Sequence, residues 1–397
     1  MFLKTLALAS CSISVLPLSA FADVTIEEKA GIEYVKEWEN VSDSEVSAIS
    51  GMTKDLVGKI DADAAKGSKR VLRDAHPKAH GCVVAKFTVD AALAANYQTS
   101  VLQPGKSYDA IIRFSSAAAT PQSDAVGDAR GMAVKLLGVP GKKLLEGQES
   151  ELTQDFVMIN FPIFVGHDAA DFSQLVSSLI HDGAPIKYFF PSLNPMTWRV
   201  KQALNLLDFN GKKDASLLQQ RFFSLVPYLL NDQPTKFGAE PCSNNTALRP
   251  DKPDENFLRK ELAGFLQSKS GCFNFVVQDY KPGFEIEDGM GWWPAGLDAA
   301  VEPPSLRIVS PGNKPVSKFN RVAQITIPPQ SFDTDAKNIY CDNLSFQPWH
   351  AVPEHRPLGS INRARRSIYL AISKHRHSVN GADAVEPTSL REFQELK

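Results

Sequence analysis

The chain has 397 residues, of which 43% are hydrophobic and 22% are charged, and its formal net charge is −2. This composition is that of a globular protein, long enough for one large domain or two ordinary ones. The balance of charges excludes a typical nucleic-acid-binding protein, because no surplus of Lys and Arg is available to neutralise phosphates.

Residues 1–22 predict an export signal. Lys4 provides a short positive region, an apolar stretch follows, and Ala20-Phe21-Ala22 ends it with small residues. We therefore expect cleavage after Ala22 and a mature protein of residues 23–397 in the periplasm or outside the cell. A lipoprotein signal ending at Cys11 is disfavoured, because the apolar stretch before it is too short. No later segment has the ~18 consecutive apolar residues of a membrane span.

The mature chain keeps four cysteines, Cys82, Cys242, Cys272 and Cys341. In an oxidising compartment, four cysteines can form two disulfides in about three alternative pairings, and the sequence does not choose among them. A chain of this size does not need disulfides as its framework. Whether a bridge forms is therefore left open.

The pattern of elements predicts one domain, since there is no internal repeat and no obvious linker. Residues 23–70 look like a charged, helical N-terminal arm, and the polar tail 378–397 is expected to be loose. Between them, segments rich in β-branched and aromatic residues indicate strands at the spacing of an antiparallel barrel or sandwich. The predicted strands cover 82–90, 107–116, 130–139, 155–165, 272–280 and 321–328, and the predicted helical regions cover 168–235, 257–269 and 358–376, with Ser360 as the N-cap of the last.

A histidine pair, His76 and His80, lies just before the first predicted strand, in RDAHPKAHG (73–81). Histidines at i and i+4 share one face of a helix, where they can bind zinc. Pro77 argues against such a helix, because it removes a backbone donor and drives His76 toward extended geometry. A zinc site would also need a third ligand, which the spacing does not supply. Taken alone, the segment is best interpreted as two histidines at the surface or at the edge of the core.

The last predicted helix places arginines beside a tyrosine. Arg365, Tyr369, Ile372 and Arg376 lie at i, i+4, i+7 and i+11, on one stripe of the helix. A tyrosine packed in the core with arginines at its rim explains this pattern without any chemistry. In the functional interpretation, a guanidinium and a bound ferric ion favour the deprotonated phenol. Tyrosinate is one recognised axial ligand of haem iron.

Four stretches, taken together, resemble the catalase superfamily. They are RDAHPKAHG (73–81), IIRFSS (111–116), DARGMAVK (128–135) and FQPWHAVPEHRPLGSINRARRSIY (346–369). They are similar to the family's segment around the distal histidine, its arginine-phenylalanine-serine strand, its aspartate-proline-arginine-glycine strand with Ala129 in place of proline, and the segment that leads to the proximal tyrosine. No single stretch is specific, but the four occur in the family's order and account for both sides of a haem.

The resemblance runs from about residue 70 to about residue 380, and it is closest to the short catalase-like branch. A long C-terminal extension and much of the usual N-terminal arm are missing. It implies an α+β fold with an antiparallel β-barrel core and flanking helices. It also implies haem b (iron protoporphyrin IX) as the cofactor.

The resemblance gives a role to residues on each side of this haem. On the proximal side, Tyr369 would bind the iron, and Arg365 would keep the phenol ionised. On the distal side, His76 would be the catalytic histidine, and Ser115 would hydrogen-bond it. His80 has no counterpart in the family and is expected to be structural.

Charged residues around the haem also follow from the resemblance. Arg73, Arg113 and Arg376 match arginines that pair with the haem propionates, a task that suits a guanidinium because its fork binds a carboxylate in two places. Asp128 matches the acidic residue of the channel that guides peroxide inward. Ala117 stands where the family usually has a bulkier valine at the channel neck, so a wider neck and larger hydroperoxides are expected.

The second distal group is where the sequence departs from the family. Alignment of TQDFVMINFPIFVGHDAADF (153–172) on Pro162 places Asn160 one position late and Ile159 where the asparagine should be. A slip of one residue in a strand turns a side chain to the other face. Asn160 is therefore a candidate catalytic residue only if the strand bulges. Phe164 matches a phenylalanine of the haem pocket, and core packing explains it equally well.

These features predict an exported haem peroxidase that reduces hydrogen peroxide or organic hydroperoxides with an unknown electron donor, and that has weak to moderate catalase activity. His76 would carry a proton from one peroxide oxygen to the other. Three alternatives stay open: rearrangement of fatty-acid hydroperoxides in an apolar channel lined by 168–235, as in the superfamily's allene oxide synthases; non-enzymatic haem binding; and, last, a zinc hydrolase on His76 and His80. A homodimer is also left open.

Overall fold

The computed structural model describes residues 24–65, 71–73, 76–242, 245–295, 315–384 and 386–397. The predicted export signal, residues 1–22, lies outside the described residues. The helices and strands are β1 (Ile26–Lys29), β2 (Ile32–Val35), α1 (Glu45–Ala65), β3 (Ala79–Val89), β4 (Ser107–Ser116), β5 (Arg130–Leu137), β6 (Thr153–Ile159), α2 (Ala169–His181), α3 (Ile186–Phe189), α4 (Val200–Gly211), β7 (Phe222–Phe223), β8 (Tyr228–Leu230), β9 (Gln233–Pro241), α5 (Phe257–Leu266), β10 (Gly271–Asp279), β11 (Trp293–Pro294), β12 (Val316–Ser317), β13 (Phe319–Ile327), α6 (Asp335–Asn343), α7 (Ser360–Asn380) and α8 (Arg391–Gln394).

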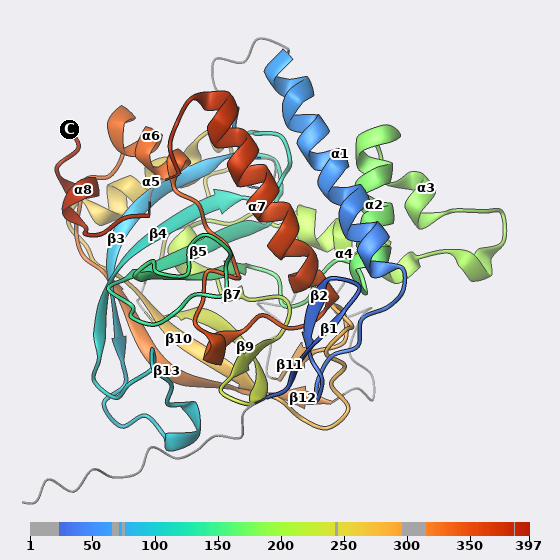
Figure 1. The fold of residues 1–397 in the computed structure, drawn as a ribbon. Helices are drawn as coiled ribbons and strands as arrows, with labels where there is room; N and C mark the ends of the chain where they lie inside the picture. The colour runs from blue at the N-terminus through green and yellow to red at the C-terminus, as the bar shows by residue number, and fades with distance from the viewer. Residues whose placement is uncertain (1–23, 66–70, 74–75, 243–244, 296–314, 385) are drawn as a thin grey trace, which may run out of the picture.

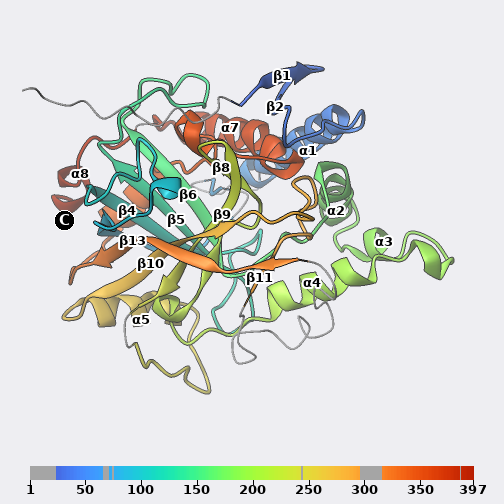
Figure 2. The same ribbon diagram turned by 90° about the horizontal axis from the view of Figure 1, so that it is seen from below.

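Within the described part of the chain, eight strands close into an antiparallel barrel (Figures 1 and 2). Their order is β10-β13-β3-β4-β5-β6-β7-β9, and β9 pairs back with β10 to complete the circle. Closure satisfies the backbone groups that an open sheet would leave at its edges. The α+β fold with an antiparallel barrel core, which the sequence predicted, is thereby confirmed.

Aromatic side chains fill the barrel. The rings of Phe87, Phe156 and Phe275 lie in its core, with centroids 5.1 Å apart for Phe87–Phe275 and 4.8 Å apart for Phe156–Phe275. Tilted and edge-on contacts of this kind bury much apolar area and add a specific geometry. These side chains leave a small pocket of about 20 Å³ beside Phe156 and Phe275, and the larger cavity described below lies outside the barrel wall.

Neighbouring strands place side chains in alternating rows, because successive residues of a strand point to opposite faces. Ile112, Val134 and Phe156 are register partners, and all three belong to the core. The next row, Arg113, Ala133 and Val157, therefore points outward. This outward row faces the helical layer.

The helical layer consists of α7, α1 and α2, which pack together beside strands β4–β6 (Figure 1). Ile368 and Ile372 of α7 share a cluster with Ile49 of α1 and Val176 of α2. Helix α7 begins after Gly359 and ends at Gly381, whose left-handed backbone (φ 59°) closes the helix. The predicted N-cap is corrected: Ser360 is the first helical residue, and its hydroxyl instead accepts from the backbone N–H of Ala169 at 3.1 Å.

The amino-terminal part differs from the helical arm predicted for 23–70. Among the described residues of this part, 24–65, the helix is α1, and it follows the hairpin β1–β2. The hairpin turns at Ala30 and Gly31, which have φ values of 52° and 80°. Two positive φ angles in a two-residue loop match the twist of paired strands.

The predicted helical region 168–235 is helical only as far as α4, and it continues as the short strands β7 and β8. The predicted strand 155–165 likewise ends at Ile159. The tail 378–397, expected to be loose, is attached to the body. Glu386 forms an ion pair with Lys135 at 2.6 Å, and Phe393 of α8 is buried in the core.

Two disulfides connect distant segments. Cys82 of β3 is bonded to Cys341 of α6, and Cys242, next to β9, is bonded to Cys272 of β10. These bonds select one of the pairings that the sequence left open. Separately, none of the described helices combines the length and the apolar character that a bilayer crossing needs.

Candidate active site

A cavity of about 110 Å³ lies between α7 and the outward row of β4–β6. Both His76 and Tyr369 line it, and they come from segments almost three hundred residues apart. Its walls also include Arg73, Arg113, Ser115, Gly131, Met132, Ala133, Asp155, Val157, Met158, Phe346, Leu370, Ile372 and Arg376.

His76 is held in the cavity wall by β4 and β5. Its Nδ1 lies 3.1 Å from the hydroxyl of Ser115. A β-carbon on the neighbouring Gly131 would lie 2.6 Å from that hydroxyl oxygen and 2.7 Å from Nδ1 of His76. Such contacts are too short for any side chain, so glycine is required here for the imidazole to reach Ser115.

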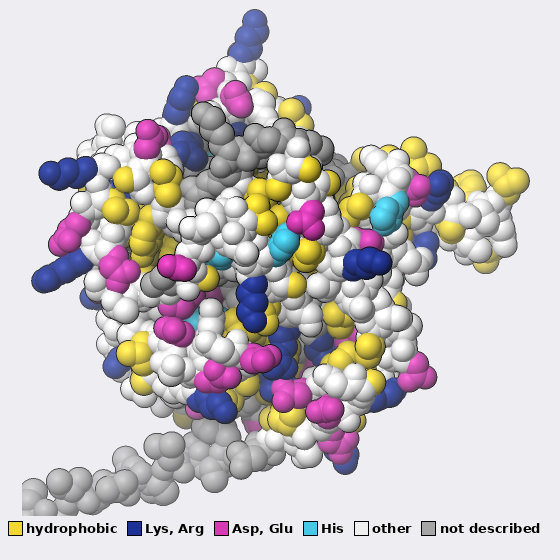
Figure 3. All heavy atoms as spheres, turned by 45° about the horizontal axis from the view of Figure 1, so that its top comes forward, with side chains coloured by type: hydrophobic (Ala, Val, Ile, Leu, Met, Phe, Trp, Pro, Cys, Tyr) yellow, Lys and Arg dark blue, Asp and Glu magenta, His cyan; other side chains and the backbone are white. Residues whose placement is uncertain are grey.

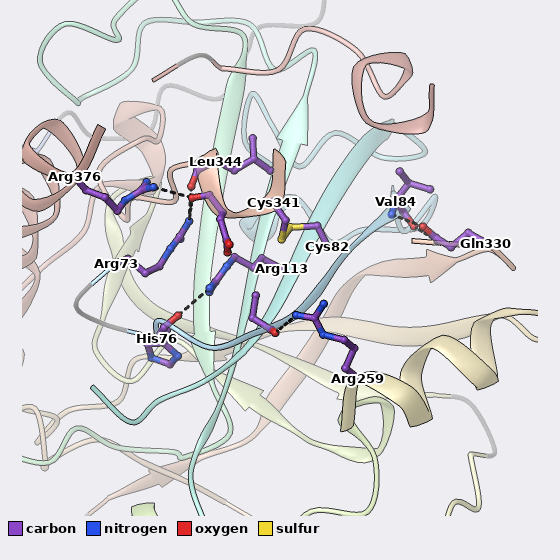
Figure 4. Close-up of a disulfide and its surroundings, with 12 residues drawn as sticks. Arg73, His76, Cys82, Val84, Arg113, Arg259, Gln330, Cys341, Leu344 and Arg376 are labelled. Carbon is purple, nitrogen blue, oxygen red and sulfur yellow. Dashed lines mark hydrogen bonds between the residues drawn. A yellow bond between two sulfur atoms is a disulfide. The ribbon is translucent and has the colours of Figure 1, made fainter. Parts of the chain in front are cut away.

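The backbone of His76 is also fixed in an unusual conformation. Its φ is 59°, in the left-handed region that few non-glycine residues adopt. The Nη2 atom of Arg113 donates to its carbonyl oxygen at 2.8 Å (Figure 4). Strain of this kind persists only where the surroundings over-determine the conformation. Among the described residues, Ser115 occupies Nδ1 of His76. Nε2 is therefore the ring nitrogen that can contact a ligand.

The electrostatic surroundings keep His76 neutral. Burial lowers its pKa to about 3, and the charges of Arg113, Arg365 and Arg73 act in the same direction. A neutral imidazole can accept a proton, which an imidazolium cannot. His76 is therefore in the form that a general base needs at neutral pH.

On the opposite wall, α7 places Arg365 one turn before Tyr369. The guanidinium carbon of Arg365 lies 5.2 Å from the centroid of the Tyr369 ring. Arg365 also contacts Oδ1 of Asn362 at 3.1 Å and the hydroxyl of Tyr228 at 3.5 Å. Burial by itself would lower the pKa of Arg365, but its interactions with Tyr369 and Tyr228 raise it. The guanidinium thus stays charged beside the phenol.

Three arginines lie together at one end of the cavity (Figure 4). Arg73 and Arg376 both donate to the carbonyl oxygen of Asp342, at 3.0 and 2.8 Å, and Arg73 also donates to that of Leu344 at 2.6 Å. Burial lowers the pKa of Arg113 to about 10, and its Nε is buried with no hydrogen-bond partner among the described residues. An unsatisfied guanidinium donor calls for an anionic acceptor.

The residues present therefore fit a haem. The cavity combines apolar walls, a tyrosine beside a fixed positive charge, a neutral imidazole, and a cluster of arginines suited to two carboxylates. Such convergence of a few polar groups in an apolar pocket is typical of cofactor sites. Of the residues expected to act at the haem, His76, Ser115, Tyr369, Arg73, Arg113 and Arg376 line this one cavity.

Asn160 lies elsewhere. The ladder between β5 and β6 runs without a register shift to the pair Gly131–Ile159, so Ile159 shares the row of Ser115 and Gly131. Asn160 falls in the next row, which faces the other way. Its Oδ1 accepts from the backbone N–H of Arg130 at 2.7 Å, and its Nδ2 lies 3.3 Å from Gln220. The strand does not bulge, and the asparagine is not brought to His76.

The other predicted positions, Phe164, Ala117 and Asp128, are not among the residues that line this cavity. Phe164 packs its ring 4.8 Å from Phe172, away from the cavity. Ala117 packs against a cluster that includes Phe161 and Phe209. The Asp128 carboxylate is buried, where it accepts from the backbone N–H of Ala118 at 3.1 Å. Burial raises its pKa.

Sequence reasoning missed a second polar wall of the cavity, formed by Asp155 and Glu386. Asp155 lies 2.7 Å from Lys135, its cross-strand partner, and Glu386 of the tail lies 2.6 Å from the same ammonium. Burial raises the pKa of Asp155. A lysine in the outward row of β5 was the available signal, since a buried ammonium requires a carboxylate partner.

Comparison with known proteins gives three results. The model of the Catalase family matches residues 59–185, a segment that contains His76 and Ser115 but not Tyr369. No curated protein sequence matches the chain. The fold resembles a fungal catalase, with a TM-score of 0.54 and 15% identity over 80% of this chain and 62% of that one. It also resembles catalase A from Saccharomyces cerevisiae, with a TM-score of 0.55 and 16% identity over 80% of this chain and 63% of that one.

The chain thus spans less than two thirds of the length of these catalases. The closed barrel, the helical layer and the cavity between them define a catalase-like fold. The family-model match over residues 59–185 and this fold both agree with the resemblance to catalases that the sequence motifs indicated.

Proposed function

We propose that the protein is a haem-dependent peroxidase that reduces hydrogen peroxide or organic hydroperoxides. The single observation that supports this proposal most strongly is the fixed, neutral imidazole of His76, held by Ser115 in the same cavity as Tyr369. When bound, the haem would supply the iron centre at which peroxide is reduced. Tyr369 would hold the iron, and Arg73, Arg113 and Arg376 would bind the propionate carboxylates of the haem.

In this proposal, residues of this chain transfer the proton of the peroxide. Nε2 of His76 would accept the proton of one peroxide oxygen and return it to the other, which leaves as water, while the electron donor would supply, through the haem, the two electrons and with them the two protons that convert the remaining oxygen to a second water. Ser115 keeps the ring in place through Nδ1. Arg365 keeps a positive charge beside the phenol of Tyr369, which favours the anionic ligand form.

The orientation of Asn160 favours peroxidase over catalase activity in this proposal. With Ile159 in the row of Ser115, Asn160 is turned away from His76, and no other asparagine of the described residues lines the cavity to hold a second peroxide. We therefore infer weak catalase turnover and reduction by an electron donor. Export by the signal at residues 1–22 is also part of the proposal, and fractionation of cells that express the full chain tests it.

Visible spectroscopy of purified protein tests the proposal. We expect a ferric haem spectrum that changes when hydrogen peroxide is added. His76→Ala should retain the pigment but lose this change by about a hundredfold or more in rate, since general acid–base catalysis contributes about 10²–10⁴-fold. Tyr369→Phe should weaken pigment retention.

Two results would contradict the proposal. One is a protein that binds no haem when haem is supplied during expression. The other is an unchanged rate in His76→Ala. A protein that holds haem fully but reacts slowly with every peroxide tried would instead be a non-enzymatic haem binder.

A further inference from the structure

An arm formed by residues 183–207 projects from the body of the molecule; it comprises α3, the following loop and the first part of α4 (Figures 1 and 2). Apolar side chains gather on the corresponding lobe at the right of Figure 3. Leu193 is 100% exposed and Met196 is 90% exposed. The exposed apolar residues of the arm are Ile186, Phe190, Leu193, Met196, Trp198, Val200 and Leu207.

The shape of the arm is fixed by its own contacts. Arg199 donates to the carbonyl oxygen of Tyr188 at 2.7 Å and pairs with Asp171 of α2 at 3.2 Å. The rings of Phe190 and Trp198 meet edge to face at 5.2 Å. The indole N–H of Trp198 also donates to the backbone at 2.9 Å. The structure thus holds these apolar side chains outward, although their exposure is unfavourable in water.

The arm also differs from the whole chain in charge. Residues 183–207 contain Lys187, Arg199 and Lys201 but no Asp or Glu, whereas the chain as a whole has a net charge of −2. Lys187 is exposed but pairs with Asp182, just before the arm, and Arg199 pairs with Asp171. Lys201 is exposed beside the apolar side chains and forms no ion pair with a described residue. An apolar tip with an available lysine complements a bilayer surface with anionic headgroups, where apolar groups enter the acyl boundary and the ammonium is attracted to the phosphates.

We propose that this arm docks the protein on an anionic lipid surface. Leu193 and Met196 enter the acyl boundary, Trp198 lies at the level of the headgroups, and Lys201 contacts the phosphates. A second protein copy fits less well, because lysines are depleted from protein–protein interfaces and a standard interface needs about 800 Å² on each partner. A narrow projecting tip suits a fluid medium that can surround it.

Helix α4 connects the arm to the residues that the family resemblance places in the channel. Leu204 and Phe209 of α4 belong to the same apolar cluster as Ala117. Just after α4, the carbonyl oxygen of Lys212 accepts from the backbone N–H of Asp128 at 2.9 Å. When the arm is docked, the membrane therefore lies on the side of the molecule that carries Ala117 and Asp128. This step rests on the proposed function, and it makes lipid hydroperoxides the expected substrate class.

Vesicle co-sedimentation tests the docking itself and does not require haem chemistry. The probes are vesicles of phosphatidylcholine alone and of phosphatidylcholine mixed with phosphatidylglycerol. We expect binding to the mixed vesicles that weakens in high salt. The double variant Leu193→Asp/Met196→Asp should lower the affinity by at least about tenfold, since burying one such side chain is worth about 1.5–3 kcal/mol. Lys201→Glu should lower it less.

Leu248→Asp is the matched control, because Leu248 is 88% exposed but lies outside the arm. It should bind vesicles as the unchanged protein does, and all variants should keep the same thermal midpoint. Equal binding by the double variant and the control, or no binding to mixed vesicles, overturns the proposal. A dimer in solution that the double variant dissociates, without vesicle binding, would assign the arm to a second copy instead.

Docking and chemistry can fail separately. Vesicle binding that persists in His76→Ala, together with loss of its peroxide reaction, supports both proposals. If vesicles bind but the rate with a phospholipid hydroperoxide is the same in the double variant and in the control, docking holds and delivery of lipid hydroperoxides is overturned.

Discussion

The position of the His76 ring depends on a neighbour that has no side chain. Gly131, the register partner of Ser115, leaves the space in which the imidazole and the hydroxyl meet. The three positions belong to three different motifs of the sequence, and the pairing of β3 with β4 and of β4 with β5 brings them together. A small residue in a strand is therefore part of the site, although it takes no part in the chemistry.

Gly131→Ala should disturb this arrangement. The added carbon would lie 2.6–2.8 Å from Ser115 Oγ and the His76 ring, so one of them must move. We expect a loss of about 1–3 kcal/mol in the free energy of unfolding, as is usual for overpacking. Urea denaturation measures the loss, and a slower spectral response to peroxide should accompany it. Gly264→Ala in α5, where a β-carbon meets nothing within 4 Å, is the control and should not destabilise the protein.

Single residues also show how far the sequence could predict the cavity. His76 and Tyr369 were found because their motifs carry fixed local spacings. The sequence motif could not show which face of the sheet carries the Asn160 side chain, because this depends on whether β6 has a bulge where it pairs with β5. The sequence was equally consistent with Phe164 in a haem pocket and with Phe164 in the core, and in the structure its ring packs against Phe172.

Among the elements, the tail after α7 changes the interpretation most. Its polar composition indicated a loose end, yet Glu386 reaches the cavity and pairs with Lys135, and its carboxylate also accepts from Thr153 at 2.8 Å. Phe393 then fixes the end of the tail in the core. One buried carboxylate and one buried aromatic ring hold the tail on the body despite its polar composition. The position of each depends on a partner that is distant in the sequence, which composition does not reveal.

Glu386→Gln tests this attachment. The change leaves the ammonium of Lys135 with Asp155 alone, so we expect a loss of about 1–3 kcal/mol in the free energy of unfolding, the usual cost of a weakened buried charge-assisted bond. The tail should also become more sensitive to limited proteolysis. Glu395→Gln, at an exposed position of the tail, should leave both measurements unchanged. Equal cleavage of the tail in the two variants would show that Phe393 alone holds it.

On the scale of the whole molecule, the long strands could be predicted and the closure of the barrel could not. Strands β3, β4, β5, β10 and β13 have enough β-branched and aromatic residues to be recognised. Strands β7 and β8 have two and three residues, too few to show any periodicity, and they lie in a region of helix-like pattern. Closure through β9 and β10 joins segments whose pairing no local signal specifies.

The two disulfides stabilise this closed barrel to different extents. Cys82–Cys341 closes a sequence separation of 259 residues, whereas Cys242–Cys272 closes one of 30. In the chain-entropy description, the longer loop removes more freedom from the unfolded chain, by about 2 kcal/mol. The double variant Cys82→Ala/Cys341→Ala should therefore lose about 2 kcal/mol more unfolding free energy than Cys242→Ala/Cys272→Ala. Denaturation of both variants under oxidising conditions measures this difference, and reduction of the unchanged protein should lower its stability below that of either variant. Equal losses would mean that strain or residual structure, and not loop length, determines how each bond acts.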